Sequence, residues 1–141
     1  MKKFLAVAAV LAVLVIAGIS APSLRGPTVV AKFSVVNQTA AVPLTTVFTP
    51  TEDGDYSVVT YETYNSTDID WTVETDLTWT DEVALRSQPA STRNHAIIAG
   101  GSLLPLHVAA GTPIQISTQY FCGLCTTPQP PYDVFVTVIK E

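Results

Sequence analysis

Charged side chains are scarce in this sequence of 141 residues, and basic ones are the scarcest. Charged residues make up 13% of the chain, with 7 lysines and arginines against 12 aspartates and glutamates, so the formal net charge is −5. Because a nucleic-acid-binding domain normally presents a basic face, this balance argues against that class of partner. The hydrophobic share of 48% is too high for an intrinsically disordered chain, and the length is that of one domain.

Sequence motifs of nucleophilic catalysis are also absent. The chain has no Gly-x-Ser-x-Gly sequence and no recognisable serine, histidine and aspartate set. Gly100-Gly101-Ser102 is predicted to be a turn, and the two histidines, His95 and His107, are predicted to be surface or hydrogen-bonded residues rather than general bases. We therefore expect no enzymatic activity and no cofactor. A glycosidase carboxylate pair stays open, because only spatial separation decides it.

The N-terminal segment has the pattern of a secretory signal peptide. Two lysines follow Met1, and a run of about 16 almost entirely apolar residues extends to Ile19. This run is shorter than the roughly 20 residues of a spanning helix. We expect residues 1–20 to be a signal peptide cleaved after Ser20, and residues 21–141 to form a domain that is secreted, periplasmic or on the cell surface, without membrane contact. An uncleaved N-terminal anchor is the alternative.

Beyond this segment, threonine, valine and isoleucine are abundant, and such β-branched residues favour strands. The clearest strand is predicted at residues 68–80, where apolar and polar residues alternate strictly. The face predicted to be buried carries Ile69, Trp71, Val73, Thr75, Leu77 and Trp79.

Shorter strands are expected at intervals of 8–12 residues, a spacing that is typical of a β-sandwich or barrel. Asp53-Gly54 predicts a hairpin turn between two of them, and residues 87–92 are expected to form a loop. In residues 133–140, valines are predicted on one face, and Phe135 and Ile139 on the other. The predicted fold class is an all-β antiparallel sandwich of eight or nine strands. The expected ranges are 29–36, 40–49, 56–64, 83–86, 93–99, 103–108, 112–121 and 133–140.

Three short motifs resemble those of C1q/TNF-like domains. Phe48, followed by Gly54, Tyr56 and Val58, is similar to the central signature of that family, in which an aromatic strand end leads into Gly-x-Tyr-x-Phe. Residues 111–116 resemble its late Gly-x-x-Val-x-Leu strand, and residues 132–136 its closing hydrophobic strand. Similar jelly-roll modules occur in bacterial surface proteins and phage structural proteins.

This resemblance implies a jelly-roll sandwich that serves as a structural or binding module outside the cell, with a homo-oligomer, a trimer in the family, as the implied assembly. The sequence departs from the family at Val58, where the family has phenylalanine, and at Ala41, where a large apolar residue is usual. It also contains no collagen-like repeat.

Cys122 and Cys125 are the only cysteines and form a CxxC pair. In a thiol-disulfide oxidoreductase such a pair begins a helix, whereas the proline-rich residues 126–131 that follow here do not start one. We expect a structural disulfide that closes a small loop in an exported protein. An exported oxidoreductase is the alternative, and a zinc site would need further ligands such as His95 and His107.

Carboxylates recur on the polar face of the strand predicted at 68–80, as Asp68, Asp70, Glu74 and Asp76. Carboxylate oxygens bind calcium, and a calcium-dependent adhesin is one hypothesis. The spaced ligands and glycine of a dedicated calcium loop are missing, so a solvated strand face is the favoured interpretation, with no metal site.

The favoured function is a secreted or cell-surface module that is not an enzyme and that associates with itself or with an extracellular protein or glycan. We expect the contact surface to include the aromatic residues Tyr61, Tyr64, Tyr120 and Phe121. Asn37-Gln38-Thr39 and Asn65-Ser66-Thr67 are N-glycosylation sequons that matter only in a glycosylating host.

Overall fold

A computed structural model describes residues 26–64, 71–93, 99–122 and 129–141. These ranges contain eight strands, and no helix in them is long and apolar enough to cross a membrane. The strands are β1 (Thr28–Gln38), β2 (Thr45–Phe48), β3 (Gly54–Tyr64), β4 (Trp71–Thr80), β5 (Leu85–Arg93), β6 (Ala99–Val108), β7 (Ile114–Cys122) and β8 (Tyr132–Lys140).

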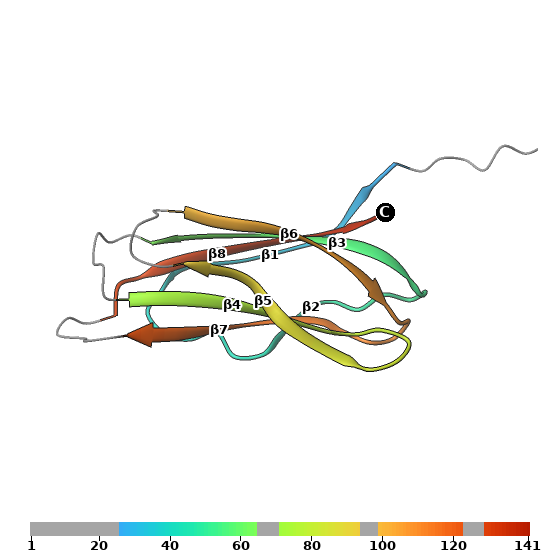
Figure 1. Ribbon diagram of the computed structural model, residues 1–141. Coiled ribbons are helices and arrows are strands. Elements are labelled where there is room, and N and C mark those ends of the chain that lie inside the picture. Colours follow the sequence, from blue (N-terminus) through green and yellow to red (C-terminus); the bar gives the residue numbers. More distant parts are fainter. Residues whose placement is uncertain (1–25, 65–70, 94–98, 123–128) are drawn as a thin grey trace, which may run out of the picture.

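The strands form two stacked four-stranded sheets (Figure 1). Sheet A has the order β1-β8-β3-β6 and sheet B the order β2-β7-β4-β5, with antiparallel pairing throughout. The first strand thus pairs with the last, the second with the seventh, the third with the sixth and the fourth with the fifth. This nesting is what results when one long antiparallel hairpin rolls up into a sandwich, which is the jelly roll. The predicted all-β jelly-roll sandwich is therefore confirmed.

The alternation that predicted the strand at 68–80 is confirmed over β4, where Trp71, Val73, Thr75 and Leu77 are buried and the residues between them are partly exposed. The assignment of faces in β8 is also confirmed, because Val134, Val136 and Val138 are buried while Phe135 is exposed. Residues 68–70 lie outside the described part.

The predicted hairpin at Asp53-Gly54 is wrong, because β2 belongs to sheet B and β3 to sheet A. The segment between them carries the chain from one sheet to the other. Gly54 is simply the first residue of β3, and a Cβ there would meet its nearest neighbour, the Tyr56 ring, at an ordinary 3.6 Å. A left-handed turn occurs instead at Gly111, with φ of 73°.

Two predicted irregular segments are strands in the structure. β5 continues through residues 87–92, and β6 continues through Gly100-Gly101, which was expected to be a turn. Pairing with β4 and β3 overrides local composition at these places. The second strand is shorter than predicted, at four residues, and most of the range predicted at 93–99 lies outside the described part.

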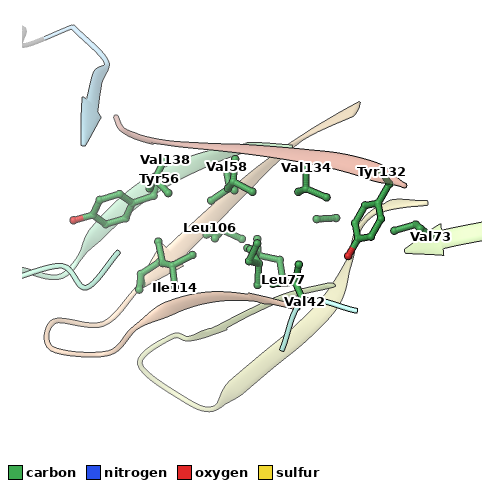
Figure 2. Close-up of a cluster of buried hydrophobic side chains, with 14 residues drawn as sticks. Val42, Tyr56, Val58, Val73, Leu77, Leu106, Ile114, Tyr132, Val134 and Val138 are labelled. Carbon is green, nitrogen blue, oxygen red and sulfur yellow. The ribbon is translucent and has the colours of Figure 1, made fainter. Parts of the chain in front are cut away.

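Apolar side chains from both sheets meet between the layers (Figure 2). The largest of the fully buried ones are Tyr56, Tyr132, Leu77, Ile114 and Ile116. Burial of apolar area at about 25 cal/mol per Å² makes this layer the main favourable contribution to folding.

Polar groups link the two sheets inside this layer. The Thr118 hydroxyl on β7 lies 2.6 Å from the Tyr132 hydroxyl on β8, and it accepts the Val42 backbone N–H at 2.7 Å. The Tyr132 hydroxyl donates to the Ala40 carbonyl at 2.9 Å. Because the tyrosine has one proton, the Thr118 hydroxyl donates to Tyr132. This chain of bonds ties sheet A to sheet B and to the segment before β2.

Two further bridges have the same function. The Thr75 hydroxyl on β4 bonds to the Glu62 carboxylate on β3, and both residues are buried. Where β6 faces β5, the Ser102 hydroxyl bonds to the Ala90 carbonyl, and the Thr60 hydroxyl lies 2.9 Å from the Ser102 hydroxyl. Buried polar groups with partners fix the relative position of the layers, since any shift leaves them unpaired.

Tyr132→Phe is expected to lower the free energy of unfolding by about 1–3 kcal/mol, because the Thr118 hydroxyl and the Ala40 carbonyl lose a buried partner. Tyr56→Phe is the matched control: Tyr56 is equally buried, and its hydroxyl points away from the core cluster in Figure 2. Urea unfolding of both variants measures the difference, and equal losses would contradict the bridging role of Tyr132.

Gly101→Ala is expected to destabilise the protein by about 1–3 kcal/mol, as overpacking does. An added Cβ would lie 2.9 Å from the Thr60 carbonyl oxygen and 3.6 Å from the Tyr61 ring. The Thr60 backbone cannot move away freely, because β3 is paired with strands on both sides. Gly26→Ala is the control, because a Cβ there meets nothing within 4 Å. Unfolding curves that coincide for Gly101→Ala and wild type would show that β6 relaxes freely.

Candidate functional site

The outer face of sheet A is unusually apolar for a surface that faces solvent. Of the nine large hydrophobic residues that the described part exposes, five lie on this face. The exposed Pro105 and the partly exposed Val59 and Ile139 add apolar area to it. We call this surface the apolar face. The five are Val29, Val36, Tyr61, Leu103 and Phe135.

Two aromatic side chains form the centre of the apolar face. Tyr61 on β3 and Phe135 on β8 are direct partners in the strand register, and their ring centroids lie 6.1 Å apart at 41°. Tyr61 also pairs with Gly101 on β6, and its ring borders the space that a side chain there would fill. Tyr61 is 44% exposed and Phe135 is 39% exposed. Both lie on the two inner strands of the sheet, where a paired strand on each side holds the backbone.

A groove of about 290 Å³ runs along β1 and β8 beside Phe135. Its polar lining comes from Lys32, Ser34 and Thr137. Phe33 on β1 and Val136 on β8 also line the groove. Register places Lys32 opposite Thr137 and Ser34 opposite Phe135, so these four side chains share the outer face. The groove is therefore continuous with the apolar face, and both Lys32 and Phe135 line it.

The outer face of sheet B is polar, and its side chains bond to one another across the strands. The Gln115 amide on β7 donates to Thr46 at 3.3 Å, and the Gln119 amide donates to Asp76 at 2.6 Å. The hydroxyls of Thr78 and Ser87 lie 3.3 Å apart. Such a face is satisfied in water, so the two outer faces of the sandwich differ in chemistry.

At one end of the sandwich, His107 bridges the two sheets. Its Nδ1 lies 2.7 Å from Asp55 Oδ1 on β3, and its Nε2 lies 3.2 Å from Glu82 Oε1 in the turn between β4 and β5. The hydrogen bond with Asp55 raises the pKa of His107 above its usual 6.5; partial desolvation opposes this, and Glu82 raises the pKa further. Only the protonated ring donates to both carboxylates at once.

The same turn has a second charged contact. Asp81 accepts the backbone N–H groups of Val83 and Ala84 at 2.8 Å and the Arg86 side chain at 2.7 Å. The bond from Ala84, followed by those from Arg86 and Val83, lowers the pKa of Asp81 to about 2. The turn therefore holds its shape over the pH range in which His107 titrates.

We expect the melting temperature to depend on pH through His107. Because its folded pKa is raised, the stabilisation is fully present below about pH 6.5 and is lost as pH rises through the folded pKa. His107→Gln should flatten the melting-temperature profile between about pH 6 and pH 9. Calorimetric scans of both proteins check this, and parallel profiles would show that the bridge contributes nothing.

The aromatic residues predicted as a contact surface lie in different places. Tyr61 is on the apolar face. Tyr120 instead points between the sheets, where its ring meets Trp71 at 5.7 Å and Tyr132 at 5.1 Å, both edge-on, because its position in β7 has the same parity as the buried Ile114. Phe121 is exposed at the end of β7 on the opposite sheet. Tyr64 ends β3 and pairs with Tyr132 in register.

The other predicted site residues are only partly described. Cys122 is the last residue of β7, and Cys125 lies outside the described part, so the disulfide stays a prediction. Asp68 and Asp70 also lie outside it, whereas Glu74 and Asp76 lie on the outer face of sheet B. No group of three histidine, cysteine, aspartate or glutamate side chains that could hold a metal occurs among the described residues.

Residues 1–20, His95 and Asn65 fall outside the described part as well. Asn37 is exposed in β1 with a left-handed φ of 57°, at an irregularity where its backbone N–H donates to Asp133 at 2.7 Å.

Sequence reasoning missed Lys32, Leu103 and Phe135 as members of one surface. The alternation in β8 already separated Phe135 from the buried valines, and that was a usable signal. Lys32 and Leu103 join Phe135 only because β1 and β6 lie in the same sheet, which depends on pairing between distant segments.

No model of a protein family matches this chain, and a search of curated proteins also gives no match. Solved structures do resemble it. The globular domain of zebrafish complement 1qA protein aligns with a TM-score of 0.52 and 14% identity, over 77% of this chain and 95% of that one. The Eiger TNF structure from S. frugiperda aligns with a TM-score of 0.43 and 12% identity, over 79% and 85% of the two chains.

At this identity a structural likeness shows the fold alone, and of these two structures the complement domain is the one with a TM-score above 0.5. That likeness agrees with the nested strand order and with the motifs around Gly54 and Gly111. The chain has the C1q/TNF-like jelly-roll fold.

Proposed function

We propose that this protein is an exported, non-catalytic structural or binding module that associates with further copies of itself through the apolar face of sheet A. The observation that carries the proposal is the contrast between the two outer faces. Sheet B has polar side chains that bond to one another, while sheet A exposes Tyr61, Leu103 and Phe135 on three adjacent strands. Exposed apolar surface of this kind marks an interaction site.

A second copy is the favoured partner for two reasons. The sequence resemblance to C1q/TNF-like domains implies self-association. The central aromatic pair also lies on the two inner strands of the sheet, so it is held in place before contact, which lowers the entropic cost of binding. Export is supported by the signal-peptide pattern of residues 1–20. A non-catalytic function is supported by the lack of a nucleophile motif in the sequence.

Leu103→Arg is expected to weaken self-association by at least about 30-fold, because it places a charge within an apolar contact. Leu85→Arg is the matched control, since Leu85 is exposed to a similar degree, 69% against 65%, but lies on β5 of sheet B. Both variants add the same charge. Sedimentation equilibrium measures the association constants.

The proposal predicts an associating wild type, a largely monomeric Leu103→Arg and a Leu85→Arg that behaves as wild type. A strictly monomeric wild type would overturn self-association. Equal weakening in both variants would overturn the assignment of the face, and far-ultraviolet circular dichroism of each variant checks that the sandwich remains folded.

A further inference from the structure

We propose that Lys32 in the groove of the apolar face binds a carboxylate of the second copy and thereby sets how the two copies dock. This inference rests on the proposed self-association and assigns a charged contact to it. The observation behind it is the position of an ammonium group in the groove that borders the central aromatic pair.

Lys32 differs from the other cations whose side chains the structure describes. Arg86 pairs with Asp81, Lys140 with Glu52, and His107 with two carboxylates, whereas Lys32 has no ion pair among the described residues. Its side chain is exposed on β1. Within the described residues this lysine has no carboxylate partner, although acidic residues outnumber basic ones in the chain, and a second copy offers many carboxylates.

The lining of the groove suits an acidic side chain of a protein. Ser34 and Thr137 provide hydroxyls that donate to carboxylate oxygens, and Phe135 provides an apolar wall for the methylene groups that precede the carboxylate. The groove also continues directly into the apolar face, so a side chain placed in it belongs to whatever covers that face.

Charge complementarity explains why such a contact matters. Two copies that both carry more acidic than basic residues repel one another, and the apolar face alone does not specify one orientation. A single cation in the apolar face stabilises the docking orientation that brings a carboxylate of the second copy to it. Other orientations are less stable because they leave like charges near one another.

Lys32→Met tests this while keeping the length of the side chain. We expect it to weaken self-association by about tenfold, and Lys32→Glu to weaken it further through repulsion, whereas Lys32→Arg should retain most of the affinity. Lys140→Glu serves as the control for net charge, because Lys140 already pairs with Glu52 within the chain. Added salt should weaken wild-type association relative to that of Lys32→Met, because it screens the Lys32 contact in the wild type and only the repulsion between acidic copies in the variant.

A labelling experiment separates the possible occupants of the groove. Brief acetylation followed by mass spectrometry is expected to modify Lys32 in the monomeric Leu103→Arg variant and to spare it in the wild-type assembly. Protection of Lys32 in both proteins would indicate a small bound anion and overturn the proposal. Equal modification in both would also overturn it, because Lys32 would then be exposed in the assembly.

The two proposals fail in different ways. A monomeric wild type means that the proposed self-association is wrong. An assembly that Leu103→Arg dissociates and that all Lys32 variants leave unchanged means that the apolar face is the interface and that Lys32 has no part in it.

Discussion

Packing of one sheet against the other is the interaction on which the rest of this structure depends. Neither four-stranded sheet has a core of its own, and the buried valines, isoleucines, leucines and tyrosines lie between the layers. Because each strand sends alternate side chains to this layer, the same packing decides which residues remain outside. Tyr61 and Phe135 face solvent since their neighbours in sequence are buried.

The interior is not uniformly apolar. The hydroxyl groups of Thr60, Thr118 and Tyr132 and the Glu62 carboxylate form hydrogen bonds from one sheet to the other. Each of these bonds requires a particular partner on the facing sheet, so they restrict sliding in a way that valine contacts do not. The result is a rigid scaffold, and its two outer faces are free to differ in chemistry without affecting the core.

Local patterns predicted much of this fold. Strict alternation identified β4 and the two faces of β8, because a period of two is visible within one strand. The sequence did not reveal which strands become neighbours: Asp53-Gly54 looked like a hairpin turn and is a crossing between sheets, while the region around Gly101 looked like a turn and is a strand. These features depend on pairing between distant segments, such as Gly101 with Tyr61. For the same reason Tyr61 was predicted as a contact residue but its companions Leu103 and Lys32 were not.

Hydroxyl-radical footprinting at increasing protein concentration tests most directly whether a second copy covers the apolar face. Oxidation of Tyr61 and Phe135 should fall as concentration rises, while that of Phe121, exposed on the other sheet, should stay constant. Oxidation of all three residues that does not change with concentration would contradict the account.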